Sequence, residues 1–212
     1  MNPIEFPKGV ETVLCVGAHC DDIEIGCGGT LLELSLRNPE TKFHWAIFSG
    51  EDERASESHR AASVLLGAKC QVDVQQFRAS YLRHDGVRVK DHFESALKPL
   101  KPDLIFTHYL NDRHQDHSFL SELTWNTFRN HVILEYEIPK YEGDLGHPNF
   151  YASIGIESMN RKVDMLMECF PSQYSRTWFS RDVFQSYMRL KGIECNAASG
   201  YAEAFHARKL VM

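Results

Sequence analysis

Two clusters of histidine and aspartate contain the side chains in this sequence that could do chemistry. The first is the stretch 19–22, His-Cys-Asp-Asp, within AHCDDIEIGCGGT, and the second is RHQDH at 113–117. Each cluster follows a run of apolar residues. Imidazole and carboxylate groups are common ligands of a divalent metal. Adjacent carboxylates at the end of a buried strand would repel each other and lose hydration without a cation. The two clusters therefore predict a metal site.

The spacing within these clusters indicates three protein ligands. His19 and Asp22 have an HxxD spacing, and His117 supplies a second imidazole. Three ligands leave a fourth position open for water, which is typical of a catalytic zinc rather than a structural one. Neighbouring carboxylates in a loop point in different directions. Asp22 can therefore bind the metal while Asp21 acts as general base on the water.

His114 and Asp116 complete the chemistry that the second cluster predicts. If His117 is the third ligand, His114 faces the substrate, where an imidazolium would stabilise an oxyanion and protonate a departing amine. Asp116, hydrogen-bonded to a histidine, would raise the pKa of that histidine and fix its tautomer.

Each cluster also has a purely structural interpretation. A histidine at a strand end is often simply hydrogen-bonded, and the Asp pair before a helix could be an N-cap. The glycines of GCGGT do not form GxGxxG or a P-loop, so they favour close helix–strand packing and unusual backbone angles over nucleotide binding. The occurrence of both clusters at the ends of buried strands favours the metal site.

The elements that must position these clusters alternate between strand and helix. Apolar runs predict strands at 12–18, 42–50, 69–75, 102–109 and 132–138. Amphipathic patterns with Pro, Gly or Asn at their ends predict helices at 28–38, 52–68, 91–98, 118–131, 157–170 and 180–191. The first of these helices has Leu31, Leu32, Leu34 and Leu36 as candidate core residues, and the tail at 200–210 is expected to pack back on the domain.

This alternation predicts one α/β domain over residues 1–212, with a Rossmann-like, doubly wound, mostly parallel sheet and helices on both faces. Ligands of such sheets bind beyond the carboxyl ends of the strands, where the strand order reverses. We expect the reversal between the first and fourth strands, which places the two clusters side by side.

The composition narrows the functional classes. A net charge of −6 argues against nucleic acid as a partner. No apolar run approaches the roughly 18 residues of a membrane span, and the first residues lack the pattern of a signal peptide. The six cysteines form no CxxC pair, so we expect reduced thiols in a cytoplasmic protein.

Both clusters together resemble the motifs of the LmbE-like, or PIG-L, family of zinc-dependent N-deacetylases. AHCDDIEIGCGGT is similar to the AHPDD and GxGGT of that family, RHQDH to its HxDH, and the tail YAEAF to its bacterial members. The resemblance implies a Rossmann-like fold. It also implies His19, Asp22 and His117 as metal ligands, Asp21 as base, and His114 as oxyanion stabiliser and acid with Asp116 as its partner.

The resemblance leaves some positions open. Arg54 lies where family members often have an arginine that contacts the substrate. Alternatively, it is a solvated arginine at the start of a helix. Glu203 in YAEAF either lies near the pocket or anchors the tail. Cys20 replaces the usual proline and Ile23 the usual glutamate, for which Glu24 could substitute. The segment 139–153 and several aromatic residues could line a sugar pocket or belong to the core: Tyr109, Trp125, Phe150, Tyr151 and Trp178.

The implied reaction is hydrolysis of an N-acetyl group on an amino-sugar conjugate of the N-acetylglucosamine type, giving acetate and a free amine. The His/Asp/His set suits Zn²⁺ and also Fe²⁺. Family members are often oligomers, which leaves a monomer and a homo-oligomer both open. Two other functions remain: hydrolysis of another bond such as a phosphoester, which often requires two metals, and sugar binding without catalysis.

Overall fold

A mixed β-sheet forms the centre of the part of the chain that this computed structural model describes, residues 9–210. Its strand order is β3-β2-β1-β4-β5-β7-β6, and the strands from β3 to β5 are parallel, whereas β7 and β6 are antiparallel. The strands are β1 Thr12–His19, β2 Lys42–Ser49, β3 Cys70–Val74, β4 Leu104–His108, β5 Val132–Tyr136, β6 Phe150–Ser153 and β7 Ala202–Ala207.

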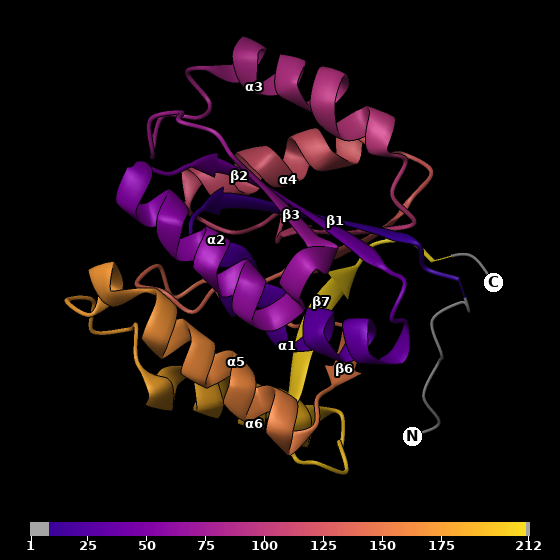
Figure 1. Ribbon diagram of the computed structural model, residues 1–212, viewed down its shortest axis with the longest axis vertical. Coiled ribbons are helices and arrows are strands. Elements are labelled where there is room, and N and C mark those ends of the chain that lie inside the picture. The colour runs from indigo at the N-terminus through magenta and orange to yellow at the C-terminus, as the bar shows by residue number, and fades with distance from the viewer. Residues whose placement is uncertain (1–8, 211–212) are drawn as a thin grey trace.

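Helices cover both faces of this sheet, as the sequence predicts (Figure 1). α3 and α4 pack on one face and α1 and α2 on the other (Figure 1). α5 lies outside α1 and α2, whereas α6 packs against α5 and strand β7. The helices are α1 Asp22–Arg37, α2 Asp52–Leu66, α3 Gly86–His92, α4 Gln115–Thr127, α5 Ile156–Cys169 and α6 Arg181–Glu194. Short 3-10 or π turns occupy Gly67–Lys69, Phe93–Leu97, Lys98–Leu100 and Pro171–Gln173. Each face has its own apolar core. The predicted α/β, doubly wound architecture is confirmed.

The strand order reverses beside β1, as expected. β1 pairs in parallel with β2 on one side and with β4 on the other. The carboxyl ends of β1 and β4 are therefore neighbours, and the segments that follow them meet at one edge of the sheet. These are the segments that contain the two histidine and aspartate clusters.

Two helices that carry site residues begin earlier than predicted. α1 begins at Asp22 rather than at residue 28, so the glycines of GCGGT lie inside a helix with ordinary helical angles. α4 begins at Gln115 rather than at residue 118, which puts Asp116 and His117 in its first turn. Tertiary packing therefore overrides the low helix propensity of glycine in α1. The expected unusual backbone angles at these glycines were wrong.

The remaining differences lie at exposed or short elements. Leu36, expected in the core, is 63% exposed at the end of α1. α3 begins at Gly86 rather than at residue 91. The tail packs back as β7, and β6 was not predicted. All six cysteines are free thiols. Within residues 9–210, no helix has both the length and the apolar character needed to cross a bilayer.

Candidate metal centre

Three side-chain atoms converge where β1 meets the loop after β4. His19 ends β1, Asp22 begins α1, and His117 lies in the first turn of α4. Nδ1 of His19 is 3.3 Å from Oδ2 of Asp22 and 3.3 Å from Nε2 of His117, and these last two atoms are 3.5 Å apart. A tetrahedron with ligands about 2.0–2.1 Å from zinc has edges of about 3.3–3.4 Å. The three atoms therefore fit three corners of a tetrahedral metal site.

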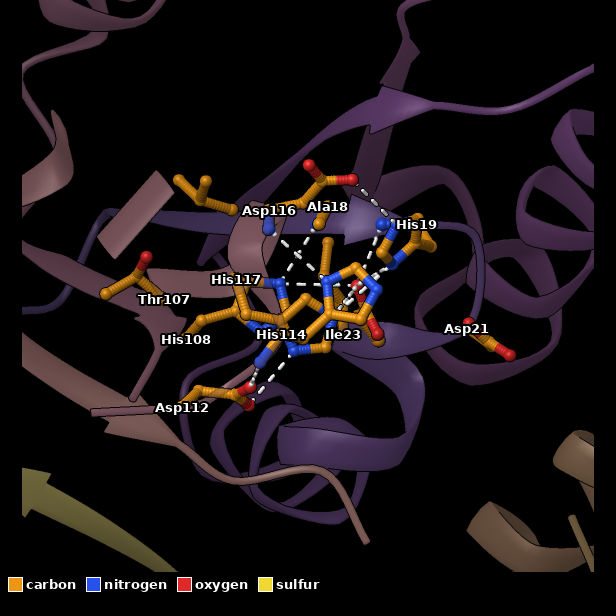
Figure 2. A network of polar contacts seen from close by, with 12 residues as sticks. Ala18, His19, Asp21, Ile23, Thr107, His108, Asp112, His114, Asp116 and His117 are labelled. Atoms are coloured by element: carbon orange, nitrogen blue, oxygen red, sulfur yellow. Dashed lines mark hydrogen bonds and ion pairs between the residues drawn. The ribbon is translucent and has the colours of Figure 1, made fainter. Parts of the chain in front are cut away.

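A carboxylate lies behind each of the two imidazoles (Figure 2). Oδ2 of Asp116 is 3.3 Å from Nε2 of His19, and Oδ2 of Asp112 is 3.0 Å from Nδ1 of His117. Such carboxylates fix the tautomer and orientation of a ligating histidine. Asp116 was expected to partner His114, and this was wrong, because its carboxylate pairs with His19.

Sequence reasoning also missed Asp112. This residue follows β4 and lies in the same polar stretch as the second cluster, DRHQDH. A further acid so close to the ligands was the available signal. Its role depends on contact with a residue five positions later, which spacing alone does not reveal.

The electrostatics of the site suit a cation. Burial alone would raise the pKa of Asp22, but His117, His108 and His19 hold it well below its usual value. Burial lowers the pKa of His19, yet the carboxylates of Asp22 and Asp116 raise it to about 10. In the absence of a metal, these carboxylates thus favour a proton on His19. A divalent cation at the same point would supply the balancing charge instead.

Asp21 occupies an unusual backbone conformation beside the ligands. Its φ is 116° and ψ is −23°, and its side chain is buried. Burial raises the pKa of Asp21 to about 7, although the positive charge of Arg54 acts in the opposite direction. Nη2 of Arg54 lies 3.1 Å from Oδ2 of Asp21, and Nη1 lies 2.9 Å from Oε2 of Glu57. Arg54 is thus a half-buried partner of Asp21 rather than a solvated arginine.

His114 is the N-cap of α4. Its Nδ1 accepts a hydrogen bond from the backbone N–H of Asp116 at 3.3 Å. Burial, with a further contribution from His19, lowers the pKa of His114. Both observations favour a neutral ring whose proton is on Nε2. The imidazolium expected at His114 stays a prediction, and these two observations favour the neutral ring over it.

Three further buried groups surround the centre. The ring of His108 stacks on that of His117 with centroids 3.9 Å apart, and its Nε2 accepts from the backbone N–H of Ala18. Burial raises the pKa of the Cys20 thiol to about 12, which disfavours a thiolate ligand. Burial also raises the pKa of Glu24 to about 8, and Oε1 of Glu24 accepts from Ser58.

A cavity of about 940 Å³ opens over the centre. Its lining includes the predicted His19, Asp21, Asp22, Arg54, His114 and His117, whereas Asp116 lies behind His19. Of the aromatic residues considered from sequence, Trp178 lines the cavity, while Trp125 is buried in the core. Glu203 anchors the tail: it pairs with Lys162 at 2.5 Å and accepts from two backbone N–H groups of α1.

Comparison with known proteins gives one family and a common fold. Residues 14–128 match the PIG-L family, described as GlcNAc-PI de-N-acetylase. The conserved protein TT1542 from Thermus thermophilus is 21% identical, with a TM-score of 0.74 over 94% of this chain and 95% of that one. N,N'-diacetylchitobiose deacetylase from Pyrococcus horikoshii is 19% identical, with a TM-score of 0.72 over 92% of this chain and 83% of that one.

A third structure is that of GalB, the 4-carboxy-2-hydroxymuconate hydratase of Pseudomonas putida KT2440. It is 17% identical, with a TM-score of 0.74 over 95% of this chain and 98% of that one. At such identities the likeness is one of fold, and folds of this kind support more than one reaction.

Proposed function

Because the chain belongs to the PIG-L family, we propose that it is a metal-dependent hydrolase that removes an N-acetyl group from an amino-sugar conjugate. Water and the acetamide give acetate and a free amine. The observation that carries the proposal is the triangle of His19 Nδ1, Asp22 Oδ2 and His117 Nε2, with the buried carboxylate of Asp21 beside it in one cavity.

His19, Asp22 and His117 would hold the metal, and the tetrahedral spacing of their atoms supports zinc, although iron(II) binds the same ligand types. When bound, such an ion supplies Lewis-acid polarisation of the acetamide carbonyl and lowers the pKa of a water molecule. Asp116 and Asp112 orient the two imidazoles toward it.

The protein side chains handle the proton transfers and the oxyanion. The carboxylate of Asp21 accepts a proton from the attacking water and returns it to the nitrogen as the C–N bond breaks. Arg54 keeps this carboxylate in place through its 3.1 Å ion pair. The Nε2–H of His114 donates a hydrogen bond to the carbonyl oxygen as negative charge develops there. Since the lowered pKa of His114 favours a neutral ring, we assign Asp21 rather than His114 as the proton donor to the amine.

The cavity supports a substrate larger than one sugar. Its 940 Å³ lies at the upper end of the range for small-molecule pockets, about 300–1,000 Å³. Tyr141 and Trp178 offer aromatic surfaces for a sugar ring, and charged side chains such as Arg78 and Arg176 line other parts of the wall. A polar conjugate of an N-acetylated amino sugar fits this lining.

Phosphoester hydrolysis is less well supported. Two-metal sites hold two ions about 3.5–4 Å apart, which together require more ligands than one three-residue set supplies. Among the described residues, the other groups that could hold a metal are His19-His114-His117 and Asp22-His108-His117. Each shares two residues with the proposed set, so neither provides an independent second site.

The test measures bound metal and acetate release in the same preparation. The protein, purified without chelator, is expected to hold about one zinc per chain and to release acetate from one or more N-acetylglucosamine conjugates. Asp21→Ala should retain the metal and lose turnover by about 10²–10⁴-fold. Asp91→Asn, an exposed change on α3, is the matched control. Full turnover by Asp21→Ala at normal metal content would contradict the assigned base.

A further inference from the structure

Asp112 contacts a proposed metal ligand and a lysine of the cavity wall through one oxygen. Its Oδ2 lies 3.0 Å from Nδ1 of His117 and 3.0 Å from Nζ of Lys140. Its Oδ1 accepts from the backbone N–H of His114 at 2.8 Å. The side chains of His117, Asp112 and Lys140 are 3%, 2% and 8% exposed. At such burial, charged hydrogen bonds are strong and well oriented.

Lys140 belongs to the loop that follows β5. Its Nζ also lies 2.8 and 2.9 Å from the two carboxylate oxygens of Asp144. Oδ2 of Asp144 accepts from the backbone N–H of Arg113 at 2.7 Å, which ties this loop to the turn after β4. The cavity lining includes Lys140, Tyr141 and Glu142. The loop is therefore part of the substrate wall. The carboxylate of Asp112 joins it to His117, and the carboxylate of Asp144 joins it to the turn after β4.

A second wall segment is joined to the other histidine in the same manner. The carboxylate of Asp116 contacts Nε2 of His19 and accepts from the backbone N–H groups of Ser80 and Leu82. The residues just before this point, 77–79, line the cavity. Each imidazole of the proposed centre is thus oriented by a carboxylate that also anchors a wall segment.

We propose that Lys140 is a positioning residue that couples the order of the loop 139–149 to metal binding at His117, through Asp112. The inference rests on the proposed metal site. A metal on Nε2 fixes the ring of His117, and a fixed ring fixes the oxygen of Asp112 to which Lys140 binds. Linkage is reciprocal, so a substrate that orders this loop also strengthens metal binding.

Amide hydrogen exchange, measured on the metal-loaded and chelator-treated full chain, tests the coupling. Arg113 and Gly146 report on the loop, because their N–H groups bond to Asp144 and Glu137. Ser80 and Leu82 report on the other wall. In the unmodified protein, zinc should slow exchange at all four amides, by about 5-fold or more. In Lys140→Met, zinc should slow exchange only at Ser80 and Leu82.

Affinity and kinetics provide independent readouts. By linkage, Lys140→Met should weaken zinc binding, measured by chelator competition, by the same factor by which it reduces loop protection. At saturating zinc it should raise KM more than it lowers kcat, because the wall loop contacts substrate. Lys140→Arg, which keeps the charge, should restore most of the metal-dependent protection. Lys98→Met, at a lysine that is 58% exposed, is the matched control.

The outcomes separate this inference from the proposed function. If Lys140→Met retains zinc-dependent protection at Arg113 and Gly146, or loses it at all four amides, the coupling through Lys140 is refuted. Lys140→Gln, which removes the charge that binds Asp112 but keeps a polar side chain, must give the same selective loss, and it replaces Lys140→Met if that variant does not fold. A protein that binds zinc without any change in exchange refutes the coupling alone. A protein that binds no metal refutes the proposed function as well.

Discussion

Asp21 and Asp22 are adjacent in sequence, yet the backbone directs them to different tasks. Asp22 is the first residue of α1, whereas Asp21 has a φ of 116°, in a region that L-residues rarely adopt. Figure 2 shows the side chain of Asp21 apart from the histidines. Such a conformation costs about 1–3 kcal/mol and persists where the surrounding structure enforces it. Here it separates the proposed base from the proposed ligands.

Removing this strain should raise stability without restoring activity. Asp21→Ala and Asp21→Gly both remove the carboxylate, but only glycine adopts a positive φ without steric cost. We expect Asp21→Gly to be more stable than Asp21→Ala by about 1–2 kcal/mol in urea unfolding of the metal-free protein. Both variants should lack turnover. If the two variants unfold at the same urea concentration and with the same dependence on urea, the backbone at this position is not strained.

The residue types and spacing of the two clusters predicted which side chains meet. They did not predict how the carboxylates are distributed. Asp116 is a sequence neighbour of two histidines, and it was natural to pair it with His114. On a helix, however, residues one or two apart do not face each other. From the first turn of α4 the side chain of Asp116 reaches His19 on β1 instead.

At the scale of the element, α1 shows why its start could not be found from sequence. Glycine lowers helix propensity, so the pattern predicted a helix after the glycines. In the fold, Gly26 packs against the ring of Tyr136, and a Cβ added at Gly26 would overlap that ring. The ring is fixed because its hydroxyl donates to the carbonyl oxygen of Val16. Close packing, which only the fold reveals, requires this glycine inside the helix.

Two alanine substitutions in α1 should therefore have opposite effects. Gly26→Ala overlaps a fixed aromatic ring and should destabilise the protein by about 1–3 kcal/mol or more. At Gly28 the nearest atom to an added Cβ is Cδ1 of Leu65, at an ordinary 3.4 Å. Gly28→Ala should stabilise the helix by about 0.5–1 kcal/mol. Thermal and urea unfolding measure both, and destabilisation of similar size in the two variants would contradict the packing argument.

The end of β5 is connected to the wall loop through Glu137. The carboxylate of Glu137 accepts from Gly146 N–H in the loop, from Tyr187 of α6 at 2.8 Å, and pairs with His206 of β7 at 3.0 Å. Burial opposes ionisation of Glu137. The hydrogen bonds outweigh burial and hold its pKa below the usual value, and the bond with His206 has the largest effect among them. The folded protein therefore binds this proton less readily than the unfolded chain does.

This depressed pKa predicts a pH-dependent contribution to stability. The contribution is fully present above the unfolded value of about 4.3 and is lost as pH falls through the folded value. Glu137→Gln should lower the free energy of unfolding by about 1–3 kcal/mol at pH 7. The difference in the free energy of unfolding between this variant and the unmodified protein should narrow as the pH is lowered from about 6 toward about 3. Glu142→Gln, at an exposed residue of the same loop, is the control. A difference in the free energy of unfolding that stays constant with pH would show that ionisation of Glu137 does not contribute to stability.

At the scale of the whole molecule, the centre lies where the strand order reverses. The alternation of strand and helix predicted this reversal, because parallel strands require crossover helices on both faces. The antiparallel β6 and β7 were harder to predict, since strands of four and six residues in an irregular segment have a weak pattern. His19 and Asp22 belong to β1 and α1, whereas His117 comes from α4, which packs on the opposite face.

A bound metal should therefore join segments that pack in different cores and stabilise the entire fold. Zinc at about 1,000 times its Kd adds about 4 kcal/mol if it binds only the folded state. For a chain of this size, that corresponds to a Tm increase of about 8–16 °C. His117→Ala should abolish the increase, whereas Asp91→Asn should retain it. Calorimetry with and without zinc measures both, and an equal increase in His117→Ala would place the metal elsewhere, because the proposed set would then lack its ligand from α4.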